Sequence, residues 1–117
     1  MNLTPQHYLN IIQDKNIQLT AKNDEYAELM KDHTEAEYTF NVAYTEKILR
    51  LKIDGEPVTT QKTIALGDKV IAKLKLELDV ADAMVKACKQ SMRVLEKGID
   101  SARSGLSWLK IEKYNTK

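Results

Sequence analysis

The second half of the chain carries a regular repeat of apolar side chains. A walk of alternating three- and four-residue steps from Ile71 to Leu109 meets an apolar residue at every step. These seam residues are Ile71, Leu74, Leu78, Ala81, Val85, Cys88, Met92, Leu95, Ile99, Ala102, Leu106 and Leu109. A repeat of about 3.5 residues keeps one side of a slightly underwound helix apolar, and so predicts the seam of a left-handed coiled coil.

A less regular pattern in the first half predicts a partner helix. Thr4 and Pro5 suit the start of a helix, and neither Gly nor Pro recurs before Gly55. One apolar column of this segment repeats every seven residues, and a companion column lies three residues further on. The first column is Ile12, Leu19, Tyr26, His33 and Phe40, and the companion column is Leu29, Ala36 and Ala43. We therefore predict a long helix over about residues 5–52.

The stretch Asp54-Gly55-Glu56-Pro57 is the strongest break in the sequence. Gly55 supplies a positive φ and Pro57 ends any helix that reaches it, so we expect a turn over residues 53–59. Thr59 or Thr60 is predicted to cap a short helix over about 60–66. Asp68 is predicted to cap a second long helix over about 68–108, followed by a frayed tail at 112–117.

Two long helices joined by a short turn predict an all-α fold, with residues 1–117 forming one long antiparallel two-helix coiled-coil hairpin. In this pairing His33 lies opposite about Asp79. Residues 22–46 contain seven acidic and two basic residues. Across from part of this segment we expect Lys73, Lys75, Lys86 and Lys89. Such a charge pattern favours antiparallel pairing, although an exposed ion pair contributes only a few tenths of a kcal/mol.

The apolar surface of the second long helix continues beyond its seam. Two further columns on one side are apolar or small, which is more than one partner helix covers. We therefore predict self-association, most simply a homodimer that forms a four-helix bundle. The predicted partner face is Val80, Met84, Ala87, Ser91, Val94, Gly98, Gly105 and Trp108. Its small residues indicate either a weak, bending stretch of helix or a smooth groove where another backbone comes close.

The sequence offers little material for catalysis or for holding a metal ion. His7 and His33 belong to no His-x-x-x-His or Glu-x-x-His pair, and no Gly-rich phosphate loop or Gly-x-Ser-x-Gly motif occurs. Cys88 is the one cysteine, which excludes an internal disulfide, and its seam position predicts a small buried hydrophobe. We predict a protein that is not an enzyme and has no catalytic residue, no metal site and no cofactor.

Composition and charge narrow the location and the class of partner. The net charge of +1 gives no global field that would recruit nucleic acid or a membrane. No stretch approaches the roughly 18 to 20 uninterrupted apolar residues of a membrane span, and the N-terminus lacks the pattern of a secretion signal. We therefore predict a cytoplasmic protein without a membrane partner.

Positive charge is nevertheless concentrated near the end of the chain. From Met84 to Lys117, eight basic residues outnumber three acidic ones. Four of them follow a three-four-four spacing and form one basic stripe: Lys86, Lys89, Arg93 and Lys97. Either this stripe is a solvated helix back, or it contacts nucleic-acid phosphates without reading the base sequence. No aromatic residue lies among the four, which argues against stacking on single-stranded bases.

Several segments resemble a known group of proteins. They are Gly55-Glu56-Pro57-Val58-Thr59, Gly67-Asp68-Lys69, the stretch from Leu76 to Ala83, and Lys86-Ala87-Cys88-Lys89. Together they resemble small helical-hairpin proteins encoded by phages and prophages of Gram-positive bacteria, often among early genes for replication and recombination. The resemblance covers about residues 35–95. It implies a setting in the host bacterial cytoplasm and carries over no catalytic residue.

These patterns support one main hypothesis and two alternatives. The main hypothesis is a phage-type interaction protein that dimerises and binds a host or phage protein within replication or recombination assemblies. The first alternative is a nucleic-acid-binding accessory protein that uses the basic stripe. The second alternative is a structural or scaffolding component of a virion, which would form higher-order assemblies.

Overall fold

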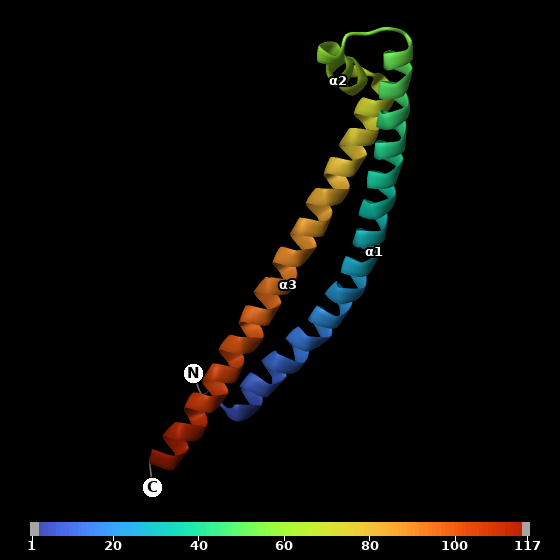
Figure 1. The fold of residues 1–117 in the computed structure, drawn as a ribbon. Coiled ribbons are helices and arrows are strands. Elements are labelled where there is room, and N and C mark those ends of the chain that lie inside the picture. Colours follow the sequence, from blue (N-terminus) through green and yellow to red (C-terminus); the bar gives the residue numbers. More distant parts are fainter. Residues whose placement is uncertain (1–2, 116–117) are drawn as a thin grey trace. The chain divides into compact units, whose positions relative to one another are not determined.

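The computed structural model describes residues 3–115, and this range contains three helices and no strand. Helix α1 spans Pro5–Ile53, α2 spans Val58–Gly67 and α3 spans Lys69–Asn115 (Figure 1). The predicted all-α class is confirmed. The two long helices and the short one between them occupy the parts of the chain that the apolar repeats and the turn residues indicated.

The chain divides into two compact units, and each contains one segment of α1 beside one segment of α3. Unit 1 comprises residues 3–27 and 87–115, and unit 2 comprises residues 28–86. The two segments are antiparallel in each unit. In unit 1, Tyr8 lies against Gly105 and Lys15 against Gly98. In unit 2, His33 is paired with Asp82, and Lys47 with Asp68.

Local hydrogen bonds explain where the helices begin. The backbone N–H of His7 donates to Thr4 Oγ1 over 3.2 Å at the start of α1. At the start of α3, Asp68 Oδ1 accepts hydrogen bonds from the backbone N–H groups of Val70 and Ile71, at 3.0 and 3.2 Å. An N-cap side chain satisfies donors that have no partner inside the helix. The predicted caps at Thr4 and Asp68 are therefore confirmed.

The turn and α2 differ from the prediction in one detail. Gly55 adopts the expected positive φ of 83°. Helix α2 begins at Val58, directly after Pro57, and no side chain caps it. Thr60, one of the two predicted caps, lies inside α2 and its Oγ1 donates to the Pro57 carbonyl over 3.0 Å. The prediction failed because proline already fixes its backbone in a conformation that can precede a helix.

Helix α3 continues to Asn115, beyond the predicted end near Trp108. Of the predicted frayed tail, residues 112–115 are helical, while residues 116–117 lie outside the described residues. Two features account for the longer helix. Neither Gly nor Pro follows Gly105, and Lys113 in the last turn suits the negative end of the helix dipole.

The α3 seam forms the core of both units. All twelve seam residues are buried or half-buried. Those that are buried are Ile71, Val85, Cys88, Leu95, Ile99 and Ala102. In unit 2 the core also contains Leu51 of α1 and Ala65 of α2, and Gln61 Nε2 donates to the Glu56 carbonyl over 2.9 Å. This hydrogen bond ties α2 to the turn before it and keeps the amide of a buried side chain satisfied.

Candidate interaction surface

A groove of about 300 Å³ lies between α1 and α3 in unit 2. Leu29 and Asp32 of α1 line one wall, and the rest of the lining comes from α3. The α3 residues that line it are Leu76, Glu77, Val80, Ala81 and Met84. Leu29 and Ala81 belong to the predicted seams, whereas Leu76, Val80 and Met84 follow one another at four-residue steps beside the α3 seam. This spacing places them on one side of the helix.

The apolar side chains of this groove are exposed to a degree that is unusual for their size. Leu76 is 62% exposed, and Val80 and Met84 are each 50% exposed. Val80 and Met84 belong to the predicted partner face. Leu76 and Leu29 were not predicted, although Leu76 lies four residues before Val80 and Leu29 lies in the companion column of α1. These three exposed apolar side chains are neighbours. Burial of such a surface against a partner lowers the free energy.

Acidic side chains flank the groove. Asp32 stands on the α1 wall and Glu77 on the α3 wall. Glu28 and Glu35 lie four residues before and three residues after Asp32, which places them on the same side of α1. Among the described residues, none of these four carboxylates forms an ion pair with a side chain of the chain itself. The groove is therefore apolar at its base and negatively charged at its edges.

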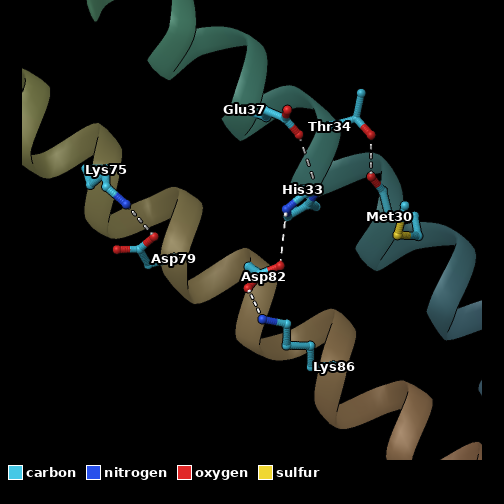
Figure 2. A network of polar contacts seen from close by, with 8 residues as sticks. All are labelled: Met30, His33, Thr34, Glu37, Lys75, Asp79, Asp82 and Lys86. Carbon is cyan, nitrogen blue, oxygen red and sulfur yellow. Dashed lines mark hydrogen bonds and ion pairs between the residues drawn. The ribbon is translucent and has the colours of Figure 1, made fainter.

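The opposite side of the α3 seam in unit 2 is polar. Figure 2 shows His33 of α1 between Glu37 and Asp82, with Nδ1 3.9 Å from Glu37 Oε2 and Nε2 3.6 Å from Asp82 Oδ1. Asp82 Oδ2 also lies 2.8 Å from Lys86 Nζ. The hydrogen bond from Lys86 is the main cause that lowers the pKa of Asp82, and the charges of Lys86 and His33 act in the same direction.

His33 meets a different aspartate from the predicted one, while Lys15 beside Gly98 and Tyr8 beside Gly105 lie within one residue of the predicted register. The partner of His33 is Asp82, one helical turn beyond the predicted Asp79. Asp79 instead pairs with Lys75 of its own helix, with its Oδ1 3.0 Å from Lys75 Nζ.

The acidic and basic residues whose charge pattern favoured antiparallel pairing form no ion pair between the two long helices among the described residues. Among the described residues, no carboxylate of residues 22–46 forms an ion pair with Lys73, Lys75, Lys86 or Lys89. Lys75 and Lys86 pair within α3. Lys89 Nζ lies 5.9 Å from the centre of the Tyr26 ring, within the range of a cation–π contact. Short pairs within one helix compete successfully with cross-helix pairs, because residues four apart are already neighbours.

Unit 1 contains the small residues of the predicted partner face, and its own α1 covers two of them. A Cβ built on Gly98 would lie 2.7 Å from Lys15 Cε, and one built on Gly105 would meet the ring of Tyr8. Ser91, Gly98 and Gly105 are accordingly half-buried. The small residues thus make room for large side chains of the same chain. On this face Ala87, Val94 and Trp108 are exposed, Val94 to 56% and Trp108 to 66%.

The four residues of the basic stripe make different kinds of contact. Lys86 in unit 2 is paired with Asp82 and Lys89 in unit 1 lies over Tyr26. Among the described residues, Arg93 and Lys97 of unit 1 form no ion pair. The side chains that remain for an outside anion are therefore Arg93 and Lys97, which lie four residues apart on α3.

Within residues 3–115, no three His, Cys, Asp or Glu side chains come together as ligands for a metal ion. In the same range, no helix combines the length and the apolar character needed to cross a membrane. Cys88 is buried, and its Sγ–H donates to the Lys22 carbonyl over 3.5 Å. Comparisons of the chain with known protein families, with curated proteins and with solved structures find no match.

Proposed function

We propose that this chain is a non-enzymatic protein-interaction module that self-associates through α3 and binds a second protein. The observation that carries the proposal is the run of exposed apolar side chains at the groove of unit 2, Leu76, Val80 and Met84. Full burial of such a side chain is worth about 1.5 to 3 kcal/mol. The resemblance to phage and prophage helical-hairpin proteins supports a setting in replication or recombination in a bacterial host.

Sedimentation equilibrium at micromolar concentration tests self-association. We expect a dimer for the wild type and a monomer for Met84→Glu, because the substitution places a carboxylate on an apolar surface that already has acidic edges. Val58→Glu is the matched control, since Val58 is 79% exposed on α2 and does not line the groove. It should leave the dimer intact. A wild type that is strictly monomeric at micromolar concentration would contradict the proposal.

The exposed Trp108 suggests where the second protein binds. Tryptophan is enriched among the residues that dominate binding energy, and this side chain is 66% exposed at the C-terminal part of α3. Affinity capture from a bacterial lysate, followed by mass spectrometry, should recover a protein with the wild type. The same protein should be lost with Trp108→Ala while the dimer persists. Equal recovery by both chains would contradict this assignment.

A further inference from the structure

We propose that the groove of unit 2 binds an amphipathic helix of the second protein, one whose apolar side chains are flanked by lysine or arginine. The exposed apolar side chains of this groove also carry the proposed self-association, so the helix and a second copy of the chain compete for one surface. The inference rests on the proposed function and names the chemistry of the partner. It makes dimerisation a state that the partner reverses.

The first argument is the shape of the groove. Leu76, Val80 and Met84 follow one another at four-residue steps on α3, and Leu29 of α1 lines the other wall. From the first to the last of these α3 residues the helix rises about 12 Å, at about 1.5 Å per residue. An apolar groove of this kind is a common docking site for a helix, whose side chains three or four residues apart then face the groove.

The second argument is the charge along the α1 wall. Glu28, Asp32 and Glu35 follow one another at steps of four and three residues, which places them on one side of α1. All three are exposed, and in the part of the chain that the structure describes none of them forms an ion pair. A bound helix with cations on the side that faces α1 can therefore pair with them without breaking an existing contact.

The α3 wall adds a further carboxylate. Glu77 lines the groove, and Lys73 lies four residues before it and seven residues before Val80, hence on the same side of α3. Over residues 3–115, neither Lys73 nor Glu77 forms an ion pair. The carboxylates around the groove outnumber this lysine, so the local field favours a basic partner.

The same carboxylates weaken the competing occupant. In a symmetric dimer both copies present the same surface. When the apolar side chains of two grooves meet, the acidic edges of the two copies therefore approach one another and lose water without gaining a cation. A basic amphipathic helix covers the same apolar side chains and supplies the missing cations. We therefore expect it to displace the second copy.

Peptide binding tests the chemistry of the occupant. The probe is a fluorescently labelled synthetic helix with leucine along one side and lysine on both flanks, and in its matched control glutamate replaces every lysine. Fluorescence anisotropy with the wild-type chain should show that the lysine peptide binds at least about tenfold more tightly than the glutamate peptide. The chain has a net charge of +1, so its overall charge would not produce this preference. Equal affinities would overturn the inference.

Charge reversal tests the location. Asp32→Lys combined with Glu77→Lys should weaken binding of the lysine peptide at least about tenfold and strengthen binding of the glutamate peptide. Asp14→Lys combined with Glu96→Lys makes the same change of charge at exposed positions of unit 1 and should leave both affinities unchanged. Trp108→Ala, which removes the other proposed contact, should also have no effect on the peptides. If the two double variants bind the peptides alike, the groove is not the site.

Sedimentation equilibrium with the lysine peptide tests the competition. We expect the peptide to convert the wild-type dimer into single chains with peptide bound. If the wild type is a dimer and the peptide leaves it intact, the inference is wrong and the proposed self-association stands. If the wild type is a monomer that binds the peptide, self-association is wrong and the assignment of the groove to a basic helix stands. A monomer that does not bind the peptide would contradict both.

Discussion

Units 1 and 2 share the α3 seam but complete it with different side chains of α1. In unit 2 the companion column of α1 is apolar, with Leu29, Ala36 and Ala43 half-buried. In unit 1 the same column continues as Lys15 and Lys22, which are also half-buried. A lysine can occupy a seam because its four methylene groups cover apolar surface while its ammonium group reaches water. A continuous apolar repeat on one helix therefore does not require an apolar repeat on its partner.

The glycines of α3 lie in the unit where large side chains of α1 complete the seam. Gly98 and Gly105 occur only in the segment of α3 that faces Lys15 and Tyr8. Each glycine inside a helix costs about 1 kcal/mol relative to alanine. At Gly105 this cost is offset, because the absence of a Cβ leaves room for the ring of Tyr8. In unit 1, α3 thus has a lower helix propensity but packs closely against α1. In unit 2, α3 contains no such glycines, and a groove lies between the two helices.

Truncation of one buried isoleucine in each unit should show the largest difference in the free energy of unfolding between the two units. Ile71 in unit 2 is 3% exposed and Ile99 in unit 1 is 5% exposed. Replacement by alanine typically costs about 2 to 5 kcal/mol, and less where the surroundings can fill the space. We expect Ile99→Ala to lie near the lower value, because the flexible stem of Lys15 lies against the neighbouring Gly98, and Ile71→Ala near the upper value. Urea unfolding followed by circular dichroism measures both.

Ile53→Ala is the control for this pair. Ile53 is 85% exposed at the end of α1, so the same truncation there should change the free energy of unfolding by less than about 0.5 kcal/mol. All variants must be compared at one protein concentration, because the proposed self-association would stabilise the folded chain. An equal or larger loss for Ile99→Ala than for Ile71→Ala would contradict the view that unit 1 has the more adaptable core.

Substitution of the two glycines by alanine should change the free energy of unfolding by smaller amounts, which differ between the two positions of unit 1. Gly98→Ala should raise the free energy of unfolding by about 0.5 to 1 kcal/mol, since alanine favours the helix and Lys15 can move aside. At Gly105 the new Cβ would meet the ring of Tyr8, which moves only as a rigid group. We therefore expect Gly105→Ala to bring no gain or a loss. Thermal unfolding of the two variants measures the difference.

A second substitution tests the cause assigned to that difference. When Tyr8 is replaced by alanine, the obstacle to a Cβ at position 105 disappears. Gly105→Ala should then be stabilising in the Tyr8→Ala background, by an amount close to that of Gly98→Ala in the wild type. If Gly105→Ala has the same effect with and without the tyrosine ring, contact between the two residues does not determine its cost.

The parts of the fold that were predictable are those that depend on residue type along one helix. The seam from Ile71 to Leu109, the turn at Gly55 and the cap at Asp68 each follow from a local rule. Lys15 and Lys22 were missed because a pattern of apolar and polar residues counts lysine as polar throughout. Its apolar stem becomes evident only when the spacing of the companion column is continued toward the N-terminus.

The groove was predictable only in part, because it depends on the register between two helices. Val80 and Met84 could be identified from α3 alone. Leu29 and Asp32 come from α1, and their place beside Val80 and Met84 depends on how the two helices are paired. The charge pattern did not help to place α1 beside α3, since Lys75 and Lys86 form their ion pairs within α3.

The smallest expected effect concerns the cap of α3 in unit 2. Hydrogen bonds from the backbone N–H groups of Ile71 and Val70, with the first the stronger cause, and the charge of Lys47 hold the pKa of Asp68 below its ordinary value. A carboxyl whose pKa is lower in the folded state stabilises the fold above the pKa of the unfolded state, about 3.9, and this contribution is lost as the pH falls through the folded value.

Asp68→Asn separates the charge of this cap from its hydrogen bonds, because asparagine caps a helix about as well as aspartate. We expect the variant to unfold at a slightly lower temperature than the wild type at pH 7, and the gap to close as the pH falls below about 4. Asp79→Asn is the control, since Asp79 also pairs with a lysine but caps no helix. A gap that stays constant from pH 7 to about 2.5 would show that the charge of Asp68 does not stabilise the start of α3.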